Sequence, residues 1–181
     1  MANKSEQKKW TEAEIKKQVE RIQKVIEEQK RLVKKDESFT AVTPEDIERK
    51  LKRVMSPMIV SQGWTSSTVP GGAINYNVGI YNPDPTQAIW GFACVWVGSG
   101  NIDPIVGTFL LNVDTRFPRL TEPKFSGLTL APGASATLSF VLKVPSTVEK
   151  TNYLGNCCHM KFNWHDVGEY LDRSVFVFNV A

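Results

Sequence analysis

The stretch Ala73-Ile-Asn-Tyr-Asn-Val-Gly-Ile-Tyr-Asn-Pro83 decides the fold class of this 181-residue chain. Its apolar side chains alternate with small or polar ones, which is the period of a β-strand with one buried face. The strand is expected to end at the turn over residues 82–85, because proline cannot continue a ladder of backbone hydrogen bonds. Similar runs lie on both sides, separated by Gly, Pro, Asn and Asp. The expected strands span residues 58–65, 73–82, 88–98, 105–113, 127–131, 136–144, 157–165 and 173–180.

Charge divides the chain into two parts near Ser56-Pro57. Residues 1–55 hold 15 Lys or Arg and 11 Asp or Glu, whereas residues 56–181 hold only 7 and 8. We therefore expect a charged helical arm over 1–56 and a β-sandwich domain over 57–181. About eight short strands joined by turns favour antiparallel pairing over a βαβ arrangement. The predicted fold class is mainly β: an antiparallel sandwich with an N-terminal arm of two α-helices.

Two stretches resemble known sandwich modules. Residues 73–83 resemble an early core strand of immunoglobulin-like bacterial modules. Residues 130–145 (Leu-Ala-Pro-Gly-Ala-Ser-Ala-Thr-Leu-Ser-Phe-Val-Leu-Lys-Val-Pro) resemble the turn and alternating strand of CARDB-like and related cell-adhesion domains. The resemblance covers roughly 70–145 and is one of pattern. It implies an immunoglobulin-like sandwich that acts as a binding or spacing module, and it supplies no functional residues.

Two of the expected strands are apolar on both faces. In 88–98, one face holds Trp90, Phe92, Cys94 and Trp96, and the other holds Ile89, Ala93, Val95 and Val97. In the last strand Val175 and Val177 lie opposite Phe176 and Phe178. A strand with one face in water normally alternates apolar with polar residues. Something is therefore expected to cover the outside of that sheet, either the N-terminal helices or a neighbouring subunit.

The first helix of the arm is expected to begin at Thr11. Thr11 and Glu14 have the spacing of a capping box, with Trp10 and Ile15 placed as a hydrophobic staple. The apolar positions then follow a 4-3-4-3-4 heptad spacing, in which Gln29 fills one gap. We expect an interface formed by Ile15, Val19, Ile22, Ile26 and Val33. That seam predicts either self-association as a short coiled coil (a dimer or trimer) or packing of the helix on its own β domain.

A second helix is expected after a short linker over 35–42. Thr43 is placed as its cap and Pro44 at its first position, where a missing N–H costs nothing. Glu45 and Asp46 suit the positive end of the helix dipole. The basic residues near the other end are interpreted as a solvated end of the helix rather than a phosphate site.

Bulk composition narrows the classes of function and partner. The net charge of +3 and the 23% of charged residues are ordinary for a globular protein. The basic residues are interspersed with acidic ones, and this mixture argues against nucleic acid as a partner. No apolar run approaches the roughly 20 residues of a membrane span, and the first residues lack the apolar core of a signal peptide. A cytoplasmic location, or one within an assembled particle, is expected.

The densest reactive cluster lies between Cys157 and Asp166. Cys157 and His159 share one face of a strand, but His165 lies some 20 Å from His159 along an extended strand, too far to share one ion. An i,i+2 Cys–His pair is also poorly placed for nucleophilic catalysis. Three cysteines, Cys94, Cys157 and Cys158, suit reduced thiols better than a disulfide framework, and their redox state is open. No metal, cofactor or catalytic residue is predicted.

The sequence favours a non-enzymatic structural or protein-interaction module that self-associates through its arm, an apolar sheet face, or both, in a larger assembly. The alternative is a ligand-binding sandwich of carbohydrate type, with Trp64 as the best candidate for an exposed ring because it lies beside Gly63 and a Thr-Ser-Ser-Thr run. A thiol-based redox or metal protein ranks third.

Overall fold

The computed structural model describes residues 10–53, 58–99, 121, 124–163 and 166–181. Its elements in chain order are α1 (Glu12–Arg31), β1 (Glu37–Ala41), α2 (Pro44–Arg53), β2 (Met58–Thr65), β3 (Ser67–Thr68), β4 (Ala73–Tyr81), β5 (Ile89–Ser99), β6 (Lys124–Leu130), β7 (Ser135–Lys143), β8 (Asn152–Asn163) and β9 (Asp166–Val180). The predicted fold class, a mainly β sandwich with two N-terminal helices, is confirmed.

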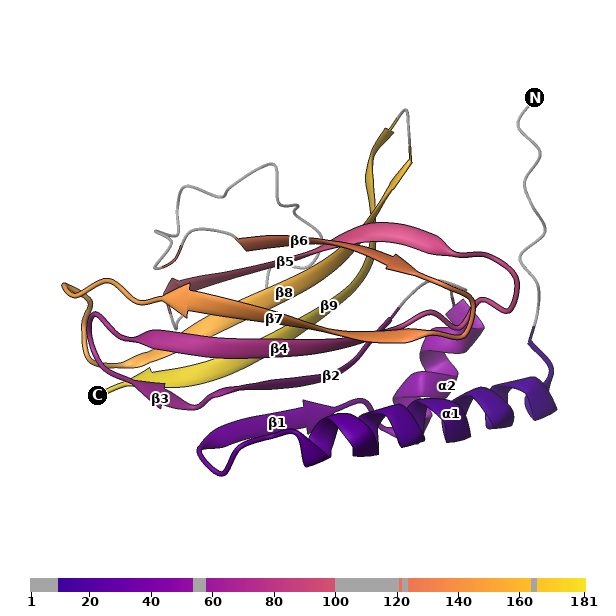
Figure 1. Cartoon of the computed structure of the whole chain (residues 1–181), viewed down its shortest axis with the longest axis horizontal. Coiled ribbons are helices and arrows are strands. Elements are labelled where there is room, and N and C mark those ends of the chain that lie inside the picture. Colours follow the sequence, from indigo (N-terminus) through magenta and orange to yellow (C-terminus); the bar gives the residue numbers. More distant parts are fainter. Residues whose placement is uncertain (1–9, 54–57, 100–120, 122–123, 164–165) are drawn as a thin grey trace.

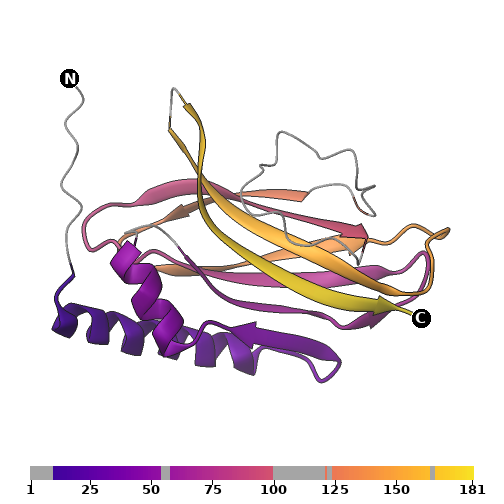
Figure 2. The ribbon, with the colours of Figure 1, turned by 180° about the vertical axis from the view of Figure 1, so that it is seen from behind.

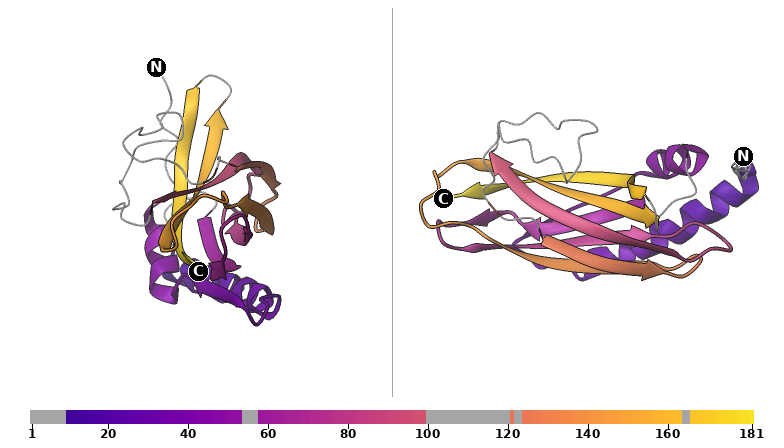
Figure 3. Two further views of the ribbon diagram at one scale, coloured as in Figure 1. Left: turned by 90° about the vertical axis from the view of Figure 1, so that its left-hand side faces the viewer. Right: turned by 90° about the horizontal axis from the view of Figure 1, so that it is seen from above.

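The strands form two sheets that pack face to face. One has four strands in the order β1-β2-β4-β7, and the other has five in the order β3-β9-β8-β5-β6. Among the described strands, each pairing is antiparallel except that of the short β3 with β9. Figures 1 and 3 show the two layers, with both helices at the side of the four-stranded sheet.

The core between the sheets follows from the alternation seen in the sequence. On β4 the buried inward side chains are those of Ile74, Tyr76, Val78 and Ile80. The ring of Phe176 on β9 stacks on Tyr76 from the opposite sheet, with ring centroids 4.3 Å apart. Gly155 on β8 leaves room for Phe176, because a Cβ at that position would collide with the ring.

Both helices begin as the sequence predicts. The backbone N–H of Glu14 donates to Thr11 Oγ1 at 3.2 Å, and the backbone N–H of Thr11 donates to Glu14 Oε2 at 2.9 Å, which confirms the capping box. At α2 the same reciprocal pair forms between Thr43 and Asp46, with Pro44 as the first helical residue. Each pair supplies acceptors to backbone donors that the first turn leaves unsatisfied.

Two sequence predictions need correction, and one of the two alternatives for covering the outer sheet face is not found. The linker expected over 35–42 contains β1, which pairs with β2 and adds a strand to the sandwich, so the arm is not purely helical. The helices cover the four-stranded sheet, whereas the strands that are apolar on both faces lie in the five-stranded one. β8 begins at Asn152 and β9 at Asp166, earlier than expected. The strand expected over 105–113 lies outside the described residues.

Candidate functional site

The apolar seam of α1 is buried against the chain's own sheet. Ile15, Val19, Ile22 and Ile26 form one cluster with residues of α2 and of the outer sheet face, Ile47, Leu51, Met58, Val60 and Tyr81. Ile22 and Ile47 are completely buried. Val33, the last predicted interface residue, is half-buried beside Gly63. Of the two arrangements that the seam predicted, the structure therefore contains packing of the helix on its own β domain.

Polar contacts continue this attachment of α1. Tyr81 donates its hydroxyl hydrogen to Gln18 Oε1 at 2.7 Å, and burial raises the pKa of this phenol. Further along the helix Gln29 donates to Thr137 Oγ1 of β7 at 3.2 Å and accepts from the Ser61 hydroxyl of β2. Because these partners come from three strands of one sheet, they fix the rotation and the position of α1 on that sheet.

The expectation that Trp64 is an exposed ring is wrong. Its side chain is only 7% exposed, and its ring lies 5.8 Å from Phe176 in the core. Its indole N–H donates to the backbone carbonyl of Val177 on β9 at 2.8 Å. In this position the ring has no face on which a sugar could stack.

Trp64 and Gln62 together join β2 to β9 across the gap between the sheets. Gln62 donates through Nε2 to the carbonyl of Val175 and accepts at Oε1 from the hydroxyl of Tyr76 at 2.9 Å. Along the described part of β9, β3 pairs only with Asn179 and Val180. Side chains of β2 therefore satisfy carbonyls on the edge of β9 that lies beyond the reach of β3.

The reactive cluster of the sequence supplies no assembled site among the described residues. Cys157 is fully buried in the core, and buried thiols in apolar surroundings are normally inert. The pairing of β5 with β8 places Cys94 opposite Cys158. The side chains of both cysteines, and those of His159 and His165, lie outside the described set. Within that set no three His, Cys, Asp or Glu side chains are grouped to hold a metal ion.

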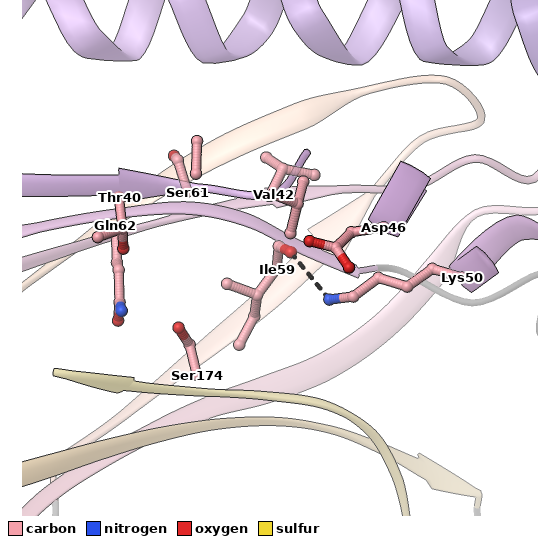
Figure 4. Close-up of a pocket in the computed structure, with 10 residues that line it drawn as sticks. Thr40, Val42, Asp46, Lys50, Ile59, Ser61, Gln62 and Ser174 are labelled. Atoms are coloured by element: carbon pink, nitrogen blue, oxygen red, sulfur yellow. Dashed lines mark hydrogen bonds between the residues drawn. The ribbon is translucent and has the colours of Figure 1, made fainter. Parts of the chain in front are cut away.

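A polar hollow of about 160 Å³ lies where α2, β1, β2 and β9 meet (Figure 4). Lys50 of α2 donates to the carbonyl of Ile59 at 3.3 Å and forms an ion pair with Asp172 of β9. Asp172 also accepts from the backbone N–H of Ile59 at 2.8 Å. These three residues tie the helix, β2 and β9 together, so the hollow is a structural junction.

Asp46 lines the same hollow and takes part in the N-terminal cap of α2. Hydrogen bonding from the backbone N–H of Thr43 lowers the pKa of the Asp46 carboxyl, and the guanidinium of Arg49 lowers it further. The charged groups of the hollow are thus engaged in holding the fold. This arrangement places no activated nucleophile beside a general base.

The outer face of the five-stranded sheet is the best candidate for a functional surface. Val175 and Val177 on β9 are 37% and 52% exposed, although their neighbours Phe176 and Phe178 are buried. In the ladder Val177 lies opposite the half-buried Leu154 of β8. Figure 2 shows α1 and α2 beside β9 rather than across it. On β5, whose sequence is apolar on both faces, the described side chains of Val95 and Val97 point into the core.

Comparison with known proteins finds only distant structural likeness. No known family matches the sequence, and no curated protein is similar to it. The C-terminal domain of wzt is 11% identical over 82% of this chain and 80% of its own, with a TM-score of 0.48. PapD-like domain 7 of human CEP192 is 12% identical over 82% and 91%, with a TM-score of 0.34.

A larger enzyme also contains a similar region. The cycloisomaltooligosaccharide glucanotransferase of Paenibacillus sp. is 14% identical over 64% of this chain, with a TM-score of 0.43. The chain spans only 13% of the length of that enzyme. Likeness at these levels does not bear on function, which has to be sought in the chain's own residues.

Proposed function

We propose that this chain is a non-catalytic protein-interaction module that self-associates through the outer face of its five-stranded sheet. The observation that carries the proposal is the exposure of Val175 and Val177, at 37% and 52%, on a face that neither helix covers. The sequence allowed two covers for such a face, and both helices are occupied on the other sheet. Of the two alternatives, a second copy of the chain is therefore the one left to cover Val175 and Val177.

The composition of this face suits contact with an identical surface. Its described positions on β8 and β9 are Asn152, Leu154, Asn156, Val175, Val177 and Asn179. None of these side chains is charged, so two copies can approach without like-charge repulsion. The asparagines can exchange hydrogen bonds across the contact, while the aliphatic side chains lose water. Face-to-face packing of two sheets at about 10 Å is a common way to bury such a surface.

The other two functions weighed from the sequence have less support. The ring proposed to bind carbohydrate is buried, because Trp64 packs in the core. Of the thiols considered for redox chemistry, Cys94, Cys157 and Cys158, the described Cys157 is completely buried. Neither side chain is available in this arrangement for the role that its residue type suggested.

Light scattering coupled to size exclusion tests the proposal on the full chain. We expect a dimer or larger species at about 100 µM, a concentration suited to an interface of ordinary size. Val177→Lys should convert it to a monomer, because two lysines would be buried opposite each other. Val141→Lys is the matched control: Val141 is 57% exposed on a strand of the other sheet. Its substitution should leave the oligomer intact.

Two results would overturn the proposal. One is a wild-type chain that stays monomeric throughout the concentration series. The other is an oligomer that Val177→Lys and Val141→Lys affect equally. Thermal unfolding of each variant confirms that it is folded, and exposed valines of this kind tolerate lysine because its stem keeps some apolar contact while its charge reaches water.

A further inference from the structure

A second surface lies at the turn after α1, away from the sheet face described above. Leu32 caps the helix and is 77% exposed, which makes it the most exposed large apolar side chain among the described residues. The next residue, Val33, turns inward beside Gly63. The backbone N–H of Val33 donates to the carbonyl of Lys30 at 3.3 Å, which holds the turn in place. Leu32 is thus held in water by an ordered backbone.

Basic side chains surround this leucine. Lys30, Arg31, Lys34 and Lys35 are all exposed. None of the four forms an ion pair with another described side chain. Two acidic residues follow them: Asp36 is exposed, and Glu37 is half-buried and accepts from the backbone N–H of Lys34 at 3.1 Å. Within residues 30–36, four cations and one exposed carboxylate therefore flank one exposed leucine, which leaves this segment with a net positive charge.

The same end of the sandwich repeats this combination. The hydroxyl of Ser66 donates to the carbonyl of Asp36 at 3.2 Å, which ties the turn after α1 to the segment before β3. That segment leads to Val69, which is 57% exposed. The turn beyond Val69 is bonded to the end of β7, near the exposed Lys143, through Val144 N–H and Gly72 O at 2.9 Å. Figure 1 shows these turns on the left-hand side of the molecule.

We propose that this end of the sandwich docks on a membrane surface that contains anionic lipid. The lysines and Arg31 would contact lipid phosphates, and Leu32 would enter the boundary between headgroups and acyl chains. Charge complementarity selects an anionic partner. The exposed leucine selects lipid over a nucleic acid or a soluble phosphate, because a leucine gains from an apolar phase that those partners do not offer. In the described part of the chain neither helix is long and apolar enough to cross a bilayer.

Sedimentation of the full chain with vesicles tests this inference. One set of vesicles is phosphatidylcholine alone, and the other contains about one third phosphatidylserine. We expect binding only to the second set, weakening as salt is raised, because screening reduces charge attraction. Leu32→Ser should reduce the affinity by about fivefold to tenfold, with no change in net charge. Lys34→Glu with Lys35→Glu should reduce it at least as much.

Two variants serve as controls. Lys16→Glu with Lys17→Glu makes the same change in charge at exposed positions near the other end of α1. Val141→Ser removes an exposed apolar side chain elsewhere. Both should bind within about twofold of the wild type. Equal losses in these controls, or no binding to the anionic vesicles, would overturn the inference.

A competition arm separates lipid from soluble phosphate. Inositol hexakisphosphate presents phosphates without an apolar phase. If Leu32→Ser binds vesicles as well as the wild type does while this compound displaces both, the turn recognises soluble phosphate and the lipid proposal is wrong. Vesicle binding and the oligomer test use different residues, so either result stands without the other.

Discussion

The carboxamide of Gln29 lies over Gly79, in the space that a side chain at position 79 would occupy. There it bridges β2 and β7, accepting from Ser61 and donating to Thr137. Gln29 is the one polar residue in the heptad seam of α1, and Gly79 is the one strand position beneath it without a side chain. The gap in the seam and the glycine in the strand are therefore complementary, and together they specify packing of α1 on its own sheet.

A double-mutant cycle should detect this complementarity. Gly79→Ala pushes the carboxamide off both hydrogen-bond partners, whereas the same change in a Gln29→Ala background meets empty space. We expect a coupling free energy on the order of 1 kcal/mol between the two positions, measured by denaturant unfolding. Additive effects of the two substitutions would show that Gln29 and Gly79 do not interact in this way.

Trp64 should contribute to stability through its indole N–H as well as through its ring. Trp64→Phe keeps an aromatic side chain but removes the donor to the carbonyl of Val177. The expected loss is about 1–3 kcal/mol of unfolding free energy, because the carbonyl is left without that partner in a part-buried position. Tyr153→Phe removes a hydroxyl that donates to the Glu149 carbonyl in a loop and should cost less. The reverse order of the two losses would argue against this role of β2.

Asn82 should be among the least replaceable polar residues. It is completely buried, and its Nδ2 donates to the carbonyls of Gln87, Leu130 and Ala131 at 2.9–3.2 Å. Asn82→Ala should lower the unfolding free energy by roughly 3 kcal/mol, because three carbonyls lose a donor. Asn75→Ala, at an exposed position on β4, should change it by less than about 0.5 kcal/mol. Similar losses in both variants would contradict the assignment.

Acid should weaken the cap of α2. The pKa of Asp46 is lowered in the folded chain, first by the hydrogen bond from the Thr43 backbone and also by Arg49. A lowered folded pKa stabilises the protein above the unfolded value of about 3.9, and this stability is lost as the pH falls through the folded pKa. Carbon NMR titration should give a midpoint for Asp46 below that of an unfolded chain. A midpoint at or above it would refute the cap.

Local signals made much of the fold predictable. The capping box at Thr11, the Thr43-Pro44 start and the alternation of β4 each depend on residues close together in sequence, so one chain is enough to find them. β1 could not be predicted in this way, because Glu37 and Ser38 break the apolar alternation and its pairing with β2 depends on tertiary contacts.

The burial of Trp64 could not be predicted for a different reason. A bulge between Ile59 and Ser61 reverses which residues of β2 face inward. Met58 and Val60 thus pack under the helices, whereas Gln62 and Trp64, two and four positions further on, face the core between the sheets. An unbroken alternation would place all four on one face. The sequence of β9 predicts that the outer face of its sheet is apolar. It does not predict which of the two sheets the helices cover.

Methyl NMR on a mixture of isotope-labelled and unlabelled chains tests the proposed self-association most directly. Self-association through the outer sheet face should give intermolecular contacts from the methyl groups of Val175 and Val177, and none from Ile15, Val19, Ile22 or Ile26. Intermolecular contacts from the isoleucines of α1, with none from the two valines, would contradict it.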